Sequence, residues 1–171
     1  MSFIEWLAQS PLSLAIQTRA WVVPTIQSVH IVAIGIVVGA VFMIDLRILG
    51  RSGRDQTLVE TVRRYGPWLW GALVVLLVTG VLMVVGEPAR ELLSFSFWLK
   101  MGLLALGTVS AAAFQVALKR NERHWEASLA TRASTKSLAI LTLLIWLAII
   151  VAGRLIAYDH VWGAWSMAPK V

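Results

Sequence analysis

Hydrophobic residues are gathered into four long stretches along the chain, and polar residues lie mainly between them. The stretches run near residues 21–44, 68–85, 95–118 and 138–158. Each reaches the roughly 18–20 residues that an α-helix needs to cross the hydrocarbon layer of a bilayer. A backbone in lipid must satisfy its hydrogen bonds within the protein, which favours helices for such stretches. The pattern therefore predicts an all-α, four-helix transmembrane bundle.

The first twenty residues show a different pattern. Apolar side chains such as Phe3 and Trp6 are interspersed with polar ones such as Glu5 and Gln9. Such a mixture is typical of a helix that lies along the membrane interface. Proline interrupts helices, so a break is expected at Pro11. We therefore expect an N-terminal interfacial amphipathic segment in front of the first span.

The composition supports a membrane protein and narrows its chemistry. The chain has 171 residues, of which 58% are hydrophobic, and its mean hydropathy is +0.77. A soluble domain of this size cannot bury so much apolar surface in one core. Four spans with their connections use the whole chain, which predicts a single integral membrane domain over residues 1–171. The absence of cysteine excludes disulfides, thiolate catalysis and Cys-ligated metal centres.

The basic residues are sorted between the connections. Ten of the 15 Lys and Arg residues lie between the first and second spans or between the third and fourth: Arg47, Arg51, Arg54, Arg63, Arg64, Lys119, Arg120, Arg123, Arg132 and Lys136. The positive-inside rule places these connections in the cytoplasm, so both termini are expected in the periplasm and the protein in the inner membrane. Because the basic residues flank apolar spans, the net charge of +6 favours contact with anionic lipid rather than with nucleic acid.

Ionisable residues inside spans are costly and mark candidate functional positions. His30 lies in the outer half of the first span, Lys100 lies at a similar depth in the third, and Arg154 lies near the outer end of the fourth, followed by Tyr158 and His160. Their shared depth predicts one polar site in the outer half of the bundle. The alternative is that His30 only forms a hydrogen bond between helices while the two cations extend to the headgroups.

Two ligands suit this predicted site. A b-type haem would use His30 as metal ligand, with His160, Met83 or an open position opposite, and Lys100 and Arg154 near the propionates. Three histidines are too few for two bis-His haems. A quinone would instead form hydrogen bonds with a His, an Arg and a Tyr at the membrane boundary, where His also suits proton transfer.

Three other functions remain open from the sequence. A copper site would draw on His30, His160, Met83 and Met167. A small transporter is a second alternative, and a non-catalytic membrane subunit or accessory protein is a third. Gly35 and Gly39 form a small-xxx-small pair on the first span, which predicts close approach of another helix. That helix would belong either to the same bundle or to a second protomer.

Polar residues near the cytoplasmic ends of the spans are expected to serve structure. Asp45 and Arg47 close the first span, and their spacing of two residues keeps them off a common helix face. We expect them to pair with the third connection or with other helix ends. Gln115, in the inner half of the third span, is expected to form a hydrogen bond between helices.

Several short blocks carry a resemblance that runs from about Ile4 to Tyr158. The most specific are His30 followed by Asp45-Leu46-Arg47, and Gly153-Arg154-Leu155-Ile156-Ala157-Tyr158. With Thr79-Gly80 and Phe97-Trp98-Leu99-Lys100, they resemble a bacterial family of small four-helix membrane proteins of unknown function. The resemblance implies the fold and the site positions and supplies no reaction.

A more distant resemblance concerns His30 on an early span and Lys100 on a later one. This pairing is similar to that in copper-resistance D type membrane proteins and in the membrane protoporphyrinogen oxidase type. The second likeness implies haem or porphyrin. The third span differs from some of these relatives, because it carries Phe114-Gln115 where they have an aromatic residue followed by His.

Overall fold

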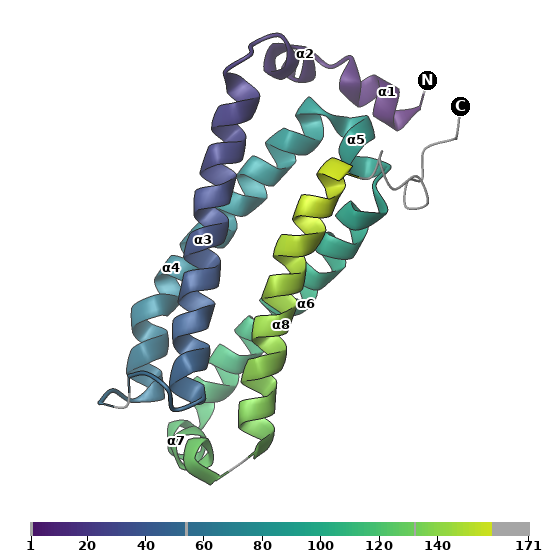
Figure 1. Ribbon diagram of the computed structural model, residues 1–171. Coiled ribbons are helices and arrows are strands. Elements are labelled where there is room, and N and C mark those ends of the chain that lie inside the picture. Colours follow the sequence, from purple (N-terminus) through teal and green to yellow (C-terminus); the bar gives the residue numbers. More distant parts are fainter. Residues whose placement is uncertain (1, 54, 132, 159–171) are drawn as a thin grey trace.

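The computed structural model describes residues 2–53, 55–131 and 133–158 of the chain. Four long helices run up and down beside one another (Figure 1): α3 (Val22–Ile48), α4 (Leu58–Gly86), α6 (Phe95–Arg120) and α8 (Ala133–Leu155). The short elements are α1 (Phe3–Ala8), α2 (Pro11–Gln17), α5 (Pro88–Leu92), α7 (Glu122–Thr131) and the 3₁₀ turn η1 (Ile156–Tyr158). The predicted all-α four-helix bundle is confirmed, and the described residues contain no strand.

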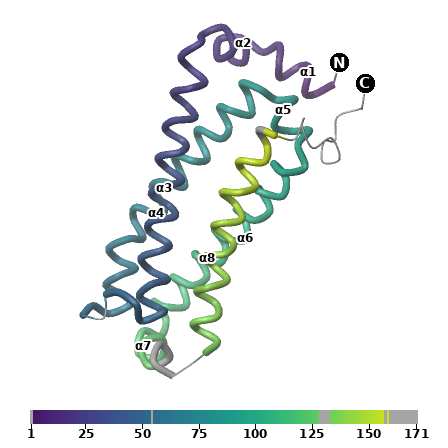
Figure 2. The backbone as a smooth tube through the Cα atoms, viewed as in Figure 1, coloured from purple at the N-terminus to yellow at the C-terminus, as the bar shows by residue number. Residues whose placement is uncertain are grey.

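The short helices distinguish the two ends of the bundle. α1, α2 and α5 lie together at one end, which we call the α2 end, and α7 crosses the other, which we call the α7 end (Figure 1). α3 packs against α4, and α6 packs against α8. α3 also contacts α8, whereas α4 and α6 have few contacts with each other. Figure 2 shows α3 and α8 moving apart toward the α2 end. The bundle is therefore tighter at the α7 end.

The core consists of two groups of buried apolar side chains. One occupies the middle of the bundle and includes Val37, Leu69 and Trp146. The other lies nearer the α7 end and includes Leu58 and Leu118. Close packing at these positions fixes how the four helices are rotated relative to one another.

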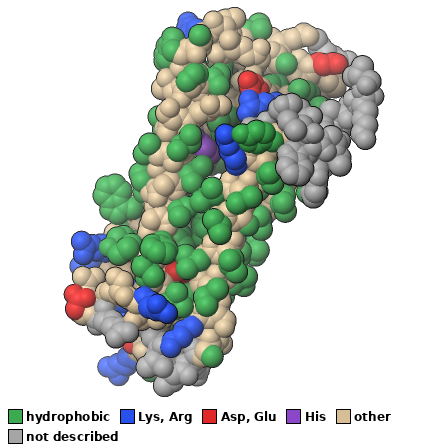
Figure 3. All heavy atoms as spheres, in the orientation of Figure 1, with side chains coloured by type: hydrophobic (Ala, Val, Ile, Leu, Met, Phe, Trp, Pro, Cys, Tyr) green, Lys and Arg blue, Asp and Glu red, His purple; other side chains and the backbone are tan. Residues whose placement is uncertain are grey.

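The outer faces of the long helices are apolar. All four helices are long and apolar enough to cross a membrane, with mean hydropathy between 1.8 for α6 and 2.5 for α4. Large exposed side chains such as Leu77 on α4 and Val109 on α6 cover these faces, and Figure 3 shows hydrophobic side chains along the visible side. An apolar surface of this extent is suited to contact with lipid.

The helices extend beyond the apolar stretches at the α7 end. α4 begins at Leu58 rather than near residue 68, because Thr57 and Glu60 form a capping box: Thr57 Oγ1 accepts from the Glu60 N–H at 3.1 Å, and the Glu60 carboxylate accepts from the Thr57 N–H at 2.8 Å. Arg63 and Arg64 therefore lie on a helix, which corrects the expected connection. Likewise Arg123 lies on α7. Hydropathy marks the depth of the hydrocarbon and not the helix end.

The N-terminal segment forms two short helices that dock on α4. The expected break is confirmed, since α1 ends at Ala8 and Ser10 caps α2 in front of Pro11. Ile16 packs so closely on Gly86 that a Cβ there would lie 2.9 Å from Ile16 Cγ2. The Gln17 side-chain amide also donates to the Gly86 carbonyl at 2.8 Å. Glycine at position 86 thus lets α2 close over the end of α4.

Candidate functional site

His30 of α3 forms a hydrogen bond with Thr79 of α4. Its Nδ1 lies 2.7 Å from Thr79 Oγ1, and Thr79 Oγ1 lies 2.7 Å from the Val75 carbonyl one turn earlier. The hydroxyl has one proton, and when it donates that proton to the carbonyl, His30 Nδ1 donates to the hydroxyl. In the neutral ring this leaves the lone pair on Nε2, which no described residue contacts through a hydrogen bond. Thr79 therefore orients the His30 ring, and its bond to the Val75 carbonyl favours the tautomer that is protonated at Nδ1.

Gly80 makes room beside the His30 ring. A Cβ at this position would lie 3.8 Å from His30 Cε1, which is ordinary van der Waals contact. A side chain larger than a methyl group would occupy the space next to the ring. The Thr79-Gly80 pair thus provides the hydrogen-bond acceptor and the clearance for His30. Sequence reasoning quoted this pair for its resemblance and did not assign it a role.

A cavity of about 270 Å³ opens beside His30 in the half of the bundle toward the α2 end. We call it the His30 cavity; its lining includes His30, Met83, Glu91, Phe97, Lys100 and Trp146. Most of its wall is aliphatic and comes from all four long helices. Figure 3 shows histidine and basic side chains beside a hollow between the helices. The cavity exists because the two helix pairs separate here.

Lys100 of α6 extends into this cavity alongside α8. Its Cδ would lie 3.5 Å from a Cβ at Gly153, so its aliphatic stem passes over this glycine. Its ammonium group lies 5.8 Å from the centre of the Phe97 ring, within range of a cation–π contact. His30 and Lys100 are therefore brought together, as their shared depth predicted.

Glu91 adds a carboxyl group that sequence reasoning missed. It lies on α5, is 7% exposed and lines the His30 cavity. α5 is a five-residue helix in the turn between α4 and α6, and this turn was treated as a plain connection. The composition of the turn carries no signal that one of its carboxyl groups faces inward. Pro88, at the start of α5, is the one local hint that the turn is helical.

Arg154 and Tyr158 form a separate pair. The Arg154 guanidinium donates to the Tyr158 hydroxyl at 3.1 Å and lies 5.2 Å from the centre of its ring. Both residues are exposed, and neither lines the His30 cavity. The expectation that Arg154 shares a cavity with His30 is thus wrong. Gly153 faces Lys100, and the next residue along α8 is rotated by about 100° around the helix axis. His160 lies outside the described residues.

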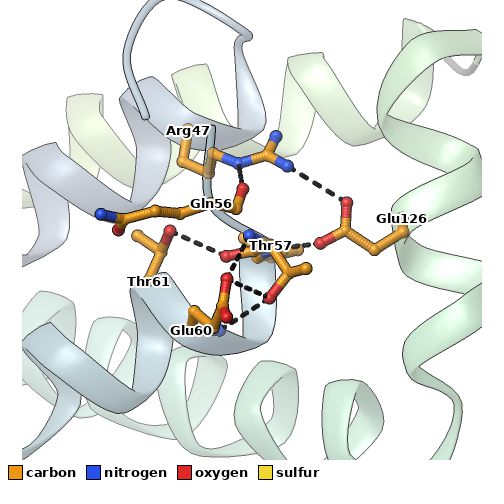
Figure 4. Close-up of polar contacts among 7 residues, drawn as sticks. Arg47, Gln56, Thr57, Glu60, Thr61 and Glu126 are labelled. Carbon is orange, nitrogen blue, oxygen red and sulfur yellow. Dashed lines mark hydrogen bonds and ion pairs between the residues drawn. The ribbon is translucent and has the colours of Figure 1, made fainter. Parts of the chain in front are cut away.

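The polar residues at the α7 end form a closed set of contacts, which Figure 4 shows. Arg47 donates to the Gln56 carbonyl at 2.7 Å and to Glu126 of α7 at 3.2 Å. The Glu126 carboxylate also accepts from the Leu58 N–H at the start of α4. We call Arg47, Gln56, Leu58 and Glu126 the α7 clamp. The expected pairing of Arg47 with the third connection is confirmed.

Two further structural expectations have clear outcomes. The Trp70 indole N–H of α4 donates to Gln115 Oε1 of α6 at 3.0 Å, so the expected interhelical hydrogen bond is confirmed. Gly35 and Gly39 have no atom within 4 Å of an added Cβ. They therefore do not support helix packing inside the bundle. Of the two partners considered, a second protomer remains, and self-association stays a prediction.

Comparison with known proteins places the chain in a family. Residues 3–159 match the model of a family of unknown function (DUF6644). The chain belongs to this family. No curated protein and no solved structure matches it. The resemblance to a family of unknown function is confirmed, while the likenesses to copper-resistance D type proteins and to the protoporphyrinogen oxidase type stay predictions.

Side chains that could bind a metal ion are not clustered in the part of the chain that the structure describes. No three His, Asp or Glu residues gather there as a metal-binding group. Of the four residues named for a copper site, Met83 and His30 line one cavity. His160 and Met167 lie outside the described residues. The arrangement at His30 combines one imidazole and one ammonium group with an apolar space, and the Glu91 carboxyl group lines the same cavity.

Proposed function

We propose that this membrane protein binds a quinone-type ligand in the His30 cavity, with the oxygen-bearing ring beside His30 and Lys100 and the apolar tail toward lipid. The observation that carries the proposal is the pairing of an oriented imidazole lone pair with an ammonium donor in one largely apolar cavity. Ligand sites commonly combine apolar walls with a few placed polar groups.

The polar groups match the oxygens of a quinone in both of its forms. The Lys100 ammonium donates only, which suits a carbonyl oxygen of the oxidised ring. His30 Nε2 accepts, which suits a hydroxyl of the reduced ring. Aliphatic side chains such as Leu104 and Ile149 provide the wall against which a planar ring and a tail pack. The site therefore suits a neutral ligand with oxygens at its edge.

Charge disfavours haem relative to quinone. The two propionates of a haem need cations, and Lys100 supplies one while Arg154 lies outside the cavity. Glu91 brings a carboxyl group into the same space, which would oppose a propionate. A neutral quinone meets no such repulsion.

A b-type haem remains the second candidate because of one observation. A hydrogen bond at Nδ1 that leaves Nε2 free is the arrangement in which metal-bound histidines are usually held. His30 would be the iron ligand, Met83 lines the same cavity as a second ligand type, and Lys100 would pair with one propionate. Bound haem would supply one-electron chemistry. An absorption spectrum separates the candidates, since haem gives a Soret band and quinone does not.

The binding test uses the purified full chain in mild detergent and a short-tailed benzoquinone as the probe. We expect saturable binding by calorimetry, weakened about tenfold in His30→Ala and in Lys100→Met, because each variant removes one of the polar contacts, worth about 1.4 kcal/mol. Arg154→Gln is the matched control and should bind as the parent does. Equal affinity in the parent, His30→Ala and Lys100→Met would overturn the proposal.

We also propose an inner-membrane location with the α2 end in the periplasm. Its support is the sorting of basic residues: Arg47, Arg63, Lys119 and Arg120 lie on helix segments at the α7 end. Four spans place the two chain ends on one side. An alkaline phosphatase fused after Val171 should be active and a fluorescent protein fused there should be dark. The reverse result would reject this orientation.

A further inference from the structure

The half of the bundle toward the α7 end contains a second cavity, of about 70 Å³. We call it the Asp45 cavity. Its walls come mainly from α3, α6 and α8, with Trp125 of α7 at one side. Its polar lining comprises Asp45, Ser110, Gln115, Thr135, Thr142 and Trp146. Among the described residues, Trp146 alone lines both this cavity and the His30 cavity.

Two buried polar atoms of this cavity have no hydrogen-bond partner. Asp45 is 4% exposed and its Oδ2 is unpaired, while Trp146 is 3% exposed and its Nε1 is unpaired. Buried polar atoms in folded proteins are nearly always satisfied by protein or by ordered water. An unpaired carboxyl oxygen in an apolar interior is especially costly. Both residues line this cavity, so a small polar molecule inside it is the partner that we expect for the unpaired atoms.

Water can donate to a carboxylate oxygen and accept from an indole N–H, whereas a metal ion suits only the oxygen. An indole N–H donates only, whereas a carboxylate oxygen accepts. A water molecule can accept from Trp146 and donate to Asp45, directly or through a second water. A cation would neutralise Asp45 but would face the positive end of the Trp146 N–H. The cavity is large enough, since one buried water needs about 10–15 Å³.

No charged side chain of the described residues competes for Asp45 in this cavity. Arg47, two residues along α3, is bonded to Gln56 and Glu126. The charged residues of the neighbouring helices near this end, among them Arg63 of α4, Lys119 of α6 and Lys136 of α8, do not line the cavity. The polar groups that line the cavity together with Asp45 are thus hydroxyl, amide and indole groups.

We infer that the Asp45 cavity is a hydrated proton-exchange site. The O–H bond of the protonated Asp45 carboxyl breaks, the proton passes to a cavity water, and carboxylate and hydronium result; the reverse step restores the acid. Ser110, Thr135 and Thr142 provide further hydroxyls along the cavity wall. Trp146 lines both this cavity and the His30 cavity. The inference does not depend on which ligand the His30 cavity binds.

Infrared difference spectroscopy of the full chain in lipid nanodiscs tests this inference. We expect a carboxyl C=O band that changes amplitude with pH and shifts on transfer to D₂O, because the group exchanges its proton with cavity water. The band should be absent in Asp45→Asn and retained at a shifted frequency in Asp45→Glu. Asp55→Asn, which changes an exposed carboxyl outside the cavity, should leave it unchanged.

Three results would overturn the inference. One is the same spectrum for the parent and for both Asp45 variants, with circular dichroism showing that they fold. A second is a band that does not respond to D₂O, which would mean a dry cavity. A third is a band that shifts with sodium at constant pH, which would mean a cation site. Trp146→Phe removes the indole donor and should shift the band; an unshifted band would contradict the bridging water.

Discussion

The α7 clamp and the His30 cavity use similar residue types in opposite ways. In the clamp, Arg47 and Glu126 form an ion pair. Arg47 also bonds the Gln56 carbonyl, and Glu126 also bonds the Leu58 N–H at a helix N-terminus, so all of these bonds lie within the clamp. In the His30 cavity, His30 has one bond and keeps an open nitrogen, and Lys100 lies over a ring beside an apolar space. A closed set of bonds stabilises a fold, whereas open donors and acceptors around a space are available to a ligand.

The difference follows from how the helix pairs pack. At the α7 end, α3, α4 and α8 approach one another around a buried group that includes Ile44, Leu58 and Ala139, and α7 covers them. Toward the α2 end the pairs separate and leave a volume of about 270 Å³. At the α7 end the polar groups of the α7 clamp bond one another. The comparison therefore predicts that clamp variants change stability and that cavity variants change ligand binding.

Glu126→Ala should have the largest effect and should act on stability. It removes the ion pair with Arg47 and the acceptor at the Leu58 N–H. We expect the free energy of unfolding to fall by about 2 kcal/mol, because charge-assisted hydrogen bonds and a helix cap are lost together. Unfolding in a mixed-detergent titration, followed by circular dichroism, measures this. Glu122→Ala, at an exposed α7 position, is the control and should change stability by less than about 0.5 kcal/mol.

Thr79→Val should act on binding instead. It keeps the shape of the side chain and removes the acceptor that orients His30. We expect quinone affinity to drop about fivefold, since a hydrogen bond of about 1 kcal/mol no longer holds the ring. Calorimetry measures it, and Ser28→Ala, which changes an exposed hydroxyl bonded to its own helix, is the control. An unchanged affinity in Thr79→Val would mean that the His30 orientation does not matter for the ligand.

Depth along the membrane was predictable from the sequence, and rotation about each helix axis was not. Four apolar stretches gave the bundle, and the positions of His30 and Lys100 along their stretches placed them at one level. Arg154 has a similar depth but lies on another face of α8, where it meets Tyr158. In lipid both faces of a helix are apolar, so hydrophobic periodicity carries little information on rotation.

Contacts between distant segments were hidden for the same reason. Thr79 contributes a hydroxyl to His30 through a helix pairing that no local pattern announces. Glu91 turns inward from a short helix whose sequence resembles an ordinary turn. By contrast, the kind of partner that Arg47 has was predictable, because a cation at a helix end lies close to the charged residues of the neighbouring connection.

Gly153→Leu should sharpen the comparison by a smaller amount. Position 153 faces the Lys100 stem, and a Cβ there would already touch Lys100 Cδ at 3.5 Å. A leucine side chain would push the ammonium from its place over Phe97. We expect quinone affinity to fall about threefold while stability changes by less than about 1 kcal/mol, since Lys100 is flexible. Arg154→Leu is the neighbouring control. If Gly153→Leu bound as tightly as the parent, the position of Lys100 would not contribute to the site.

Gly39→Leu should have the smallest effect on the bundle, and it tests the one surface that belongs to neither region. No described side chain lies within 4 Å of a Cβ added at position 39, and leucine favours a helix over glycine by about 0.5–1 kcal/mol, so stability should not fall. A smaller assembly in this variant would then mean that a contact with a second protomer has been lost. We expect the variant to elute as a smaller particle than the parent in detergent, by size exclusion with light scattering. Gly71→Leu, at an exposed glycine on α4, is the matched control. An unchanged mass for Gly39→Leu would mean that this face contacts lipid and not a second protomer.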